Sequence, residues 1–223
     1  MSKTTIPAGG LASDSVTTAK IADDAVGNTK LDLTANYAFT GTVTGTNSSW
    51  NKISTNTISS AVNTVEWTGI DDTYKVYAVV VNNMQLDGDG GIGFRVGTSS
   101  GYSDSGYRFT GFASVANTTA VNGVGNQSAN RFSITGTHYN FGGNTNESAN
   151  LVCWFYNLRG TSGHKTFATH TAFTEGGDNH GQSFLTGRLY EVSPTAKDRI
   201  QFGNIGGSAN MDTGDFTLYG VEQ

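Results

Sequence analysis

The sequence predicts an almost all-β protein, a jelly-roll-like antiparallel β-sandwich preceded by an extended segment. Charged residues make up only 14% of the 223 residues, and Gly, Thr, Ser and Asn fill their place. This composition favours turns and strands over helices. Short apolar runs alternate with Gly-, Asn- and Asp-rich turns, and no amphipathic helical pattern lies between them. Antiparallel sheets are therefore favoured over parallel ones, which need crossover helices.

The amino-acid composition of the chain changes near residue 50. Residues 1–50 contain few aromatic side chains, whereas aromatics recur from residue 51 onward between Gly-rich breaks. We expect residues 1–50 to form a stem and residues 51–223 to form a β-sandwich head.

A repeat dominates the expected stem. Residues 11–33, LASDSVTTAKIADDAVGNTKLDL, contain nearly the same decad twice, with apolar side chains five residues apart. This spacing matches neither a lone helix nor a flat strand, and one such segment cannot bury its own apolar positions. Copies from sister chains around a rotation axis would cover them, and a flexible linker is the alternative. The apolar positions are Leu11, Val16, Ile21, Val26 and Leu31.

Ten runs in the expected head have the composition of strands. In DRIQFG, Ile200 and Phe202 share one face while Arg199 and Gln201 share the other, the pattern of a half-buried strand. The ten runs are residues 63–70, 74–82, 92–97, 107–112, 131–136, 150–158, 165–173, 182–192, 198–204 and 215–221.

Two of these runs are rich in apolar residues, and VYAVVV is apolar on both faces. VYAVVV, residues 76–81, is expected at the centre of a sheet. In NLVCWFYNL, residues 150–158, we expect Cys153 to be a small buried hydrophobe and Trp154 to pack in the core.

The order of several segments resembles a known group of proteins. Residues 6–31, IPAGGLASDSVTTAKIADDAVGNTKL, resemble the A-D-x-A-V-x-x-x-K-[IL] repeats near the start of many bacteriophage tail-fibre and other virion-appendage proteins. Residues 74–109 and the closing GDFTLYGV are similar to the carboxy-terminal β-domain of such fibres. The resemblance implies a homotrimeric viral structural protein, assembled in the host cytoplasm, whose stem docks on other virion proteins and whose head performs host attachment.

The resemblance leaves the place on the virion open, because this chain has essentially no shaft between stem and head. A short tail fibre or tail-tip receptor-binding protein is expected. A capsid-decorating or head-fibre protein without a receptor role is the alternative, and a glycan-degrading tail spike is a further one. Candidate carboxylates for glycan cleavage are Asp71, Asp72, Glu175 and Asp178, but a chain with 18 acidic residues yields such pairs by chance.

Receptor binding is expected in loops that combine aromatic and amide side chains. Aromatic faces pack on the C–H-rich faces of sugars, while Asn and Asp bind their hydroxyl groups. Each of these loops would otherwise be an ordinary polar loop. The candidates for glycan binding are Tyr102, Asp104, Tyr107, His138, Tyr139, Asn140, Asp178, Asn179 and His180.

No catalytic residue, cofactor or metal ligand is expected. The chain has neither G-x-S-x-G nor H-E-x-x-H. His164 and His170 would lie about 20 Å apart along one strand, too far to share a zinc ion. The stretch LDGDGGIG, residues 86–93, lacks the later ligands of a calcium loop and is expected to be a hairpin turn.

Charge and hydropathy limit the partners further. The net charge is −5, and no dense run of Lys or Arg is present, so nucleic acid is not an expected partner. Neither a secretory signal nor a stretch of about 20 apolar residues is visible, so no membrane insertion is expected.

Overall fold

The structure is a computed structural model that describes residues 49–118, 120–136, 139–206 and 209–222. The chain divides into two units, Met1–Thr46 and Asn47–Gln223, and every described residue belongs to the second. The expected stem, with Leu11, Val16, Ile21, Val26 and Leu31, lies outside the described residues and remains a prediction.

The described residues contain strands and no helix, so the all-β prediction is confirmed. None of them therefore forms a helix able to cross a membrane. In chain order the strands are β1 (Trp50–Ile58), β2 (Thr64–Trp67), β3 (Val76–Leu86), β4 (Gly91–Thr98), β5 (Gly101–Tyr102), β6 (Tyr107–Val115), β7 (Asn122–Ala129), β8 (Phe132–Ser133), β9 (Ala149–Tyr156), β10 (Lys165–Glu175), β11 (Asn179–Leu189), β12 (Arg199–Gly206) and β13 (Met211–Val221).

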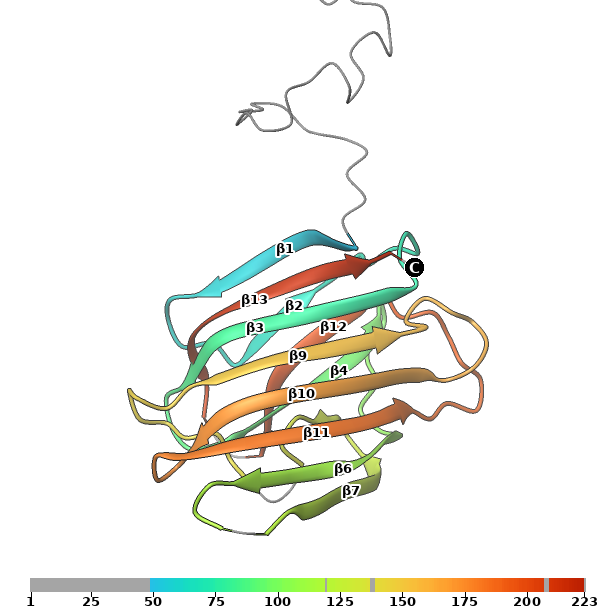
Figure 1. The fold of residues 1–223 in the computed structure, drawn as a ribbon. Coiled ribbons are helices and arrows are strands. Elements are labelled where there is room, and N and C mark those ends of the chain that lie inside the picture. The colour runs from blue at the N-terminus through green and yellow to red at the C-terminus, as the bar shows by residue number, and fades with distance from the viewer. Residues whose placement is uncertain (1–48, 119, 137–138, 207–208, 223) are drawn as a thin grey trace, which may run out of the picture. The chain divides into compact units, whose positions relative to one another are not determined.

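The strands form two antiparallel sheets that pack face to face (Figure 1). The larger sheet has eight strands in the order β1-β13-β3-β9-β10-β11-β6-β7. The smaller sheet has the order β2-β12-β4-β5, with β8 also paired to β4. The antiparallel sandwich is confirmed, and it contains more strands than the eight of a simple jelly roll.

Each of the ten predicted runs contains a strand. Two longer strands were not predicted, and these are β1 and β7, the two edges of the larger sheet. Edge strands bury little, and NGVGNQSA of β7 is mostly exposed, so their sequences lack the apolar signal.

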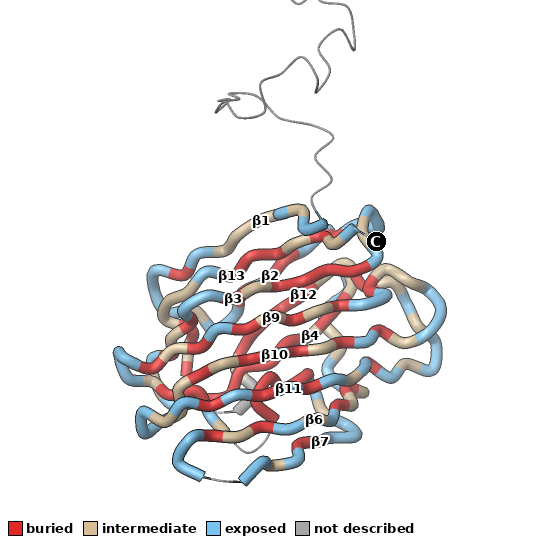
Figure 2. The backbone as a smooth tube through the Cα atoms, in the orientation of Figure 1, coloured by how far each residue is buried: buried red, intermediate tan, exposed pale blue. Residues whose placement is uncertain are grey.

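Alternation along the strands of the larger sheet decides which side chains reach the core (Figure 2). In β10, Lys165, Phe167, Thr169, Thr171 and Phe173 are buried, while the residues between them are exposed or half-buried. Antiparallel pairing keeps this alternation in phase between β9, β10, β11 and β6, so one face of the sheet covers the core and the other is open.

Aromatic side chains fill the space between the sheets. Phe94 of β4 lies at the centre, and its ring is 4.8 Å from Phe132, 4.8 Å from Phe155 and 5.1 Å from Phe167, measured between centroids. All four rings are almost completely buried. Ile200 and Phe202 of β12 face the same core, as the alternation in DRIQFG predicts.

Two local predictions from the apolar runs are wrong. Trp154 is half-buried on the open face, because Cys153 and Phe155 on either side of it point into the core. Strands β3 and β4, on either side of residues 87–90, belong to different sheets, so LDGDGGIG connects the two layers and is not a hairpin turn. Cys153 is buried as predicted, and burial raises the pKa of its thiol.

Replacing Phe94 with alanine tests the central position of this ring. Removal of a fully buried phenylalanine costs about 3–5 kcal/mol, because the cavity only partly collapses. We expect Phe94→Ala to lower the free energy of unfolding by about that amount, measured by chemical denaturation. Phe112→Ala, which removes a ring from the open face, is the control and should cost under about 1 kcal/mol. Equal losses in the two variants would contradict the assigned core.

Candidate functional site

The open face of the larger sheet, defined as the face turned away from the smaller sheet, contains a groove of about 990 Å³. It crosses strands β9, β10, β11, β6 and β7 near the carboxyl end of β11. We call it the open-face groove. It is lined by Arg108, Phe109, Thr110, Gly125, Asn126, Gln127, Tyr156, Thr166, Phe167, Ala168, Thr186, Gly187 and Arg188.

Small side chains in register form the floor of the open-face groove. Ala168 of β10 pairs with Thr186 of β11, Thr186 pairs with Thr110 of β6, and Thr110 pairs with Gly125 of β7. At about 4.8 Å between neighbouring strands, this row extends about 14 Å across the sheet. The floor is therefore long enough for an extended ligand lying across the strands.

An aromatic row borders the floor on one side. It consists of His170, Phe184 and Phe112, which are paired across β10, β11 and β6. Each of them is two residues along its strand from a floor residue and therefore on the same face of the sheet. The rings of His170 and Phe184 stack at 4.0 Å, and those of Phe184 and Phe112 are 5.2 Å apart. Phe184 and Phe112 are 37% and 39% exposed, which is unusual for phenylalanine and leaves apolar surface beside the groove.

Cationic and polar side chains border the other side. Tyr156 of β9 pairs with Thr166, Thr166 pairs with Arg188, and Arg188 pairs with Arg108. The guanidinium of Arg108 lies 4.1 Å from the centre of the Tyr190 ring, and that of Arg188 lies 5.8 Å from the same centre. One exposed tyrosine thus holds both arginine side chains at the groove.

Backbone features bring the two arginines together. A Cβ added to Gly187 would lie 2.2 Å from the carbonyl oxygen of Arg108, so only glycine allows β11 and β6 to approach this closely. The register of β6 and β7 shifts between Tyr107 and Phe109, opposite Arg108. Such bulges redirect side chains, and this one places Gln127 at the groove.

Neither groove arginine has an acidic partner within the part of the chain that the structure describes. The ion pairs there are Lys197–Glu191 and Arg199–Asp198, and neither includes Arg108 or Arg188. No Asp or Glu lines the open-face groove. The groove is therefore a local concentration of positive charge in a protein whose net charge is −5.

Among the sequence-predicted binding residues that the structure describes, Tyr107 and His180 lie near opposite ends of β11. Tyr107 pairs with Leu189 at one end, whereas Gly181, beside His180, pairs with Val115 at the other. Eleven residues of strand separate these ends, a distance of about 33 Å. The described candidates therefore do not form one site, and none of them lines the open-face groove.

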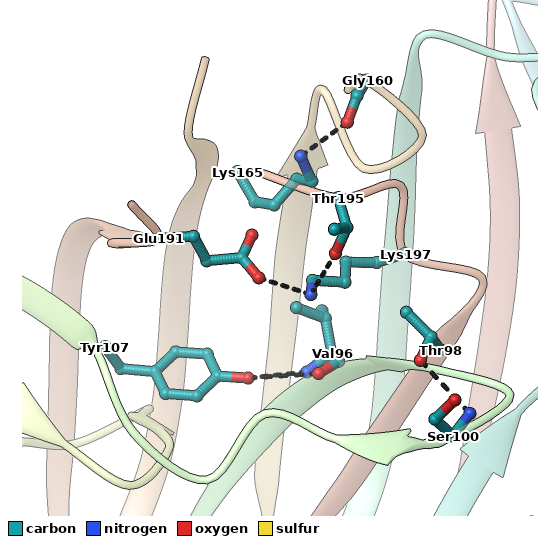
Figure 3. Close-up of polar contacts among 9 residues, drawn as sticks. All are labelled: Val96, Thr98, Ser100, Tyr107, Gly160, Lys165, Glu191, Thr195 and Lys197. Atoms are coloured by element: carbon teal, nitrogen blue, oxygen red, sulfur yellow. Dashed lines mark hydrogen bonds and ion pairs between the residues drawn. The ribbon is translucent and has the colours of Figure 1, made fainter. Parts of the chain in front are cut away.

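The first predicted loop is largely occupied by contacts within the protein. Tyr102 donates its hydroxyl hydrogen to the Glu66 carboxylate and lies beside Arg95, on the smaller sheet. Asp104 is exposed. Tyr107 is fully buried, and its hydroxyl oxygen accepts the Val96 N–H at 2.8 Å (Figure 3), so the expectation that it contacts a ligand is wrong. Burial raises the pKa of Tyr107.

The other described candidates lie between β8 and β9, or at the start of β11 and in the turn before it. The Tyr139 ring lies 6.4 Å from that of Phe173, and its hydroxyl accepts a hydrogen bond from Asn122 at 2.5 Å. Asn140 is exposed, and so are Asp178 and His180, whereas Asn179 is half-buried. His138 lies outside the described residues. These loops remain candidates, and the hollow beside His180 is smaller than the groove, at about 340 Å³.

The described residues contain no cluster of three or more His, Cys, Asp or Glu side chains able to hold a metal ion. Asp87 instead accepts hydrogen bonds from the Asn210 backbone and side chain, at 2.6 and 2.7 Å. Asp89 accepts the Gly143 N–H at 3.0 Å. The two aspartates of LDGDGGIG thus connect loops.

A second polar cluster, shown in Figure 3, lies next to Tyr107. The Lys197 ammonium donates to Glu191 at 2.5 Å and to Thr195 at 2.9 Å, and the nearby Lys165 donates to the Gly160 carbonyl at 2.7 Å. Both lysines are almost fully buried, and burial lowers the pKa of Lys165. Because each ammonium has a hydrogen-bond partner within the chain, we interpret this cluster as part of the fold and not as a binding site.

A scan of protein-family models finds no match to this chain, and searches of curated proteins and of solved structures find none either.

Sequence reasoning missed the residues of the open-face groove, above all Arg108, Tyr156, Thr166, Thr186 and Arg188. Their outward direction follows from the alternation in the runs that contain them. Their assembly into one site depends on the pairing of β9, β10, β11 and β6, which no local pattern reveals.

One buried carboxylate fixes the turn between β10 and β11. Glu147 is fully buried and accepts the backbone N–H groups of Asn144 at 2.7 Å, Gly177 at 3.1 Å and Asp178 at 3.3 Å. The hydrogen bond from Asn144 is the main cause that lowers the pKa of Glu147 below its ordinary value of 4.5. The charged form is thus favoured in the folded protein.

Glu147→Gln tests this anchor through its pH dependence. Because folding lowers the pKa of Glu147, the unfolded chain takes up a proton first as pH falls, and the stabilisation by Glu147 disappears through the folded-state pKa. At neutral pH we expect the variant to be about 2 kcal/mol less stable, since charged hydrogen bonds are lost. This gap should narrow as pH falls below 4.5, measured by urea unfolding across pH. A gap that stays constant with pH would contradict the assignment.

Proposed function

We propose that this protein is a bacteriophage virion appendage whose β-sandwich head attaches to a host-surface glycan through the open-face groove. The observation that carries the proposal is the groove itself, with its floor of small side chains between an aromatic row and a polar border. The repeat in residues 11–33 and its resemblance to virion-appendage proteins support the viral part.

The chemistry of the open-face groove suits a sugar chain. Thr110, Thr166 and Thr186 offer hydroxyl groups, and Asn126 and Gln127 offer amides that both donate and accept hydrogen bonds. Tyr156 is 38% exposed and presents an aromatic surface to the C–H faces of a sugar. Binding sites of this kind combine apolar contact area with a few polar groups that fix orientation.

The composition of the groove favours binding over cleavage. Glycoside hydrolysis generally needs two carboxyl groups on either side of the scissile bond. The groove lining contains no carboxylate. Glu175 is the last residue of β10 and Asp178 lies in the turn that follows, at the far end of β11 from the groove.

A structural head without a receptor role is the second candidate. The exposed apolar surface of Phe112 and Phe184 favours it, because such a surface would also suit contact with another virion protein. The two functions differ in one observable: a decorating protein does not compete with the phage for adsorption to its host.

Filling the floor of the groove tests glycan binding. Full-length protein should bind at least one member of a panel of bacterial surface polysaccharides, and Ala168→Gln should weaken that binding at least tenfold, because its longer side chain occupies the floor. Ala172→Gln, the same change on the open face of the same strand beyond the groove, is the matched control. Equal binding by the two variants would remove the groove from the proposal, as would no binding by the native chain. Release of reducing sugar would favour the enzyme.

The proposed stem is tested by the mass of the full-length protein in solution. We expect sedimentation at three times the chain mass of 23.4 kDa. Ile21→Asp should shift the protein toward the monomer, because a charge would replace an apolar side chain that sister chains cover. Thr18→Asp, at a polar position of the same repeat, should leave the trimer intact. A monomeric native chain would contradict the stem.

A further inference from the structure

Arg108 and Arg188 are directly opposite each other on neighbouring antiparallel strands. Side chains in such pairs have Cβ atoms about 5 Å apart, and two like charges there destabilise a sheet. Both side chains also lie around one ring, that of Tyr190, so they do not diverge into solvent. The chain therefore holds two positive charges together at a site where the fold gains nothing from their proximity.

Two neighbouring cations without an acidic partner among the described residues suit a ligand of negative charge. We propose that the open-face groove takes an acidic glycan, and that Arg108 and Arg188 bind the carboxylate of one of its sugars. This inference rests on the proposed glycan-binding function and adds the charge of the ligand. It explains why two unpaired arginines border a groove whose other lining residues are neutral.

The geometry of arginine favours a carboxylate. A guanidinium presents parallel N–H donors that match the two oxygens of a carboxylate, and its charge strengthens each hydrogen bond. Arg188 is exposed, whereas Arg108 is half-buried and its Nε has no hydrogen-bond partner within the described residues. The Arg108 guanidinium thus lies against Tyr190, and that of the more exposed Arg188 lies farther from the same ring.

The rest of the groove sets the position of the sugar that carries the charge. Thr166 lies between Tyr156 and Arg188 in the row of residues paired across the sheet. The floor residues Thr186 and Thr110 are two residues along their strands from the two arginines. A sugar on the floor would place a carboxylate at the arginines while its hydroxyl groups meet the threonines. On the opposite side, Phe184 and Phe112 offer apolar contact next to the exposed imidazole of His170.

The test measures binding of full-length protein to polygalacturonate and to alginate, each beside its carboxyl-reduced form, with neutral dextran and dextran sulfate as further probes. We expect binding to at least one carboxylated polymer and at least a tenfold loss when its carboxyl groups are reduced. Higher salt should weaken this binding, because exposed charges are screened.

Arg188→Gln assigns the charge to the groove. This variant should bind the carboxylated polymer at least tenfold more weakly. The midpoint of its thermal unfolding should equal or exceed that of the native chain, because the repulsion between Arg108 and Arg188 is relieved. Arg199→Gln is the matched control, because Arg199 lies in β12 of the smaller sheet and is 3.7 Å from Asp198. It should bind like the native chain.

Several outcomes would overturn the inference in distinguishable ways. Binding of a neutral polymer that is sensitive to Ala168→Gln and insensitive to Arg188→Gln would leave the proposed function standing and remove the acidic ligand. Binding of dextran sulfate alone would replace the carboxylate by a sulfate ester. A marked fall in the thermal midpoint of Arg188→Gln would assign the arginines to the fold. Absence of binding to any polymer would end both proposals.

Discussion

The alternation of side chains along the strands of the larger sheet is the constraint on which the rest of the structure depends. A strand that directs every second residue into the core must direct the others outward. In β10, Phe167 and Thr169 are buried on the core side, so Ala168 and His170 necessarily reach the open face. The core around Phe94 therefore determines which residues border the groove, because a shift by one residue would exchange the two sets.

The two faces of the larger sheet differ in how their side chains are paired and packed. The buried face is filled by tightly packed aromatic rings, and the polar ends of Tyr107 and Lys165 on this face have hydrogen-bond partners within the chain. The open face leaves Phe112 and Phe184 exposed and Arg108 and Arg188 without acidic partners among the described residues. Local arrangements that bring the fold no stability are typical of sites that act on something outside the protein.

The position of the groove on strands, not loops, affects how it would bind. Side chains on paired strands are held by the hydrogen-bonded ladder and change position less than loop side chains. The row from Ala168 to Gly125 is therefore a preformed floor, and little ordering is needed when a ligand binds. The turn between β10 and β11 is instead anchored by Glu147, at the far end of β11 from the groove.

The sequence alone determined the fold class and most of the strands, because composition, turns and alternation are local properties. It also placed Ile200, Phe202 and Cys153 in the core, since each lies in a run whose pattern specifies the buried face. The stem residues and the viral role remain predictions from sequence.

Only the tertiary structure decided which residues from distant parts of the chain are neighbours. Tyr107 is buried although its loop resembles a binding loop, and Trp154 faces outward although its run is rich in apolar residues. The turn at residues 87–90 connects two sheets, and the polar edge strands β1 and β7 follow from their pairing partners. Arg108 and Arg188 are 80 positions apart in the numbering, and only the register of β6 with β11 sets them opposite each other. Pairing between distant strands is a non-local property, so no short stretch of sequence specifies it.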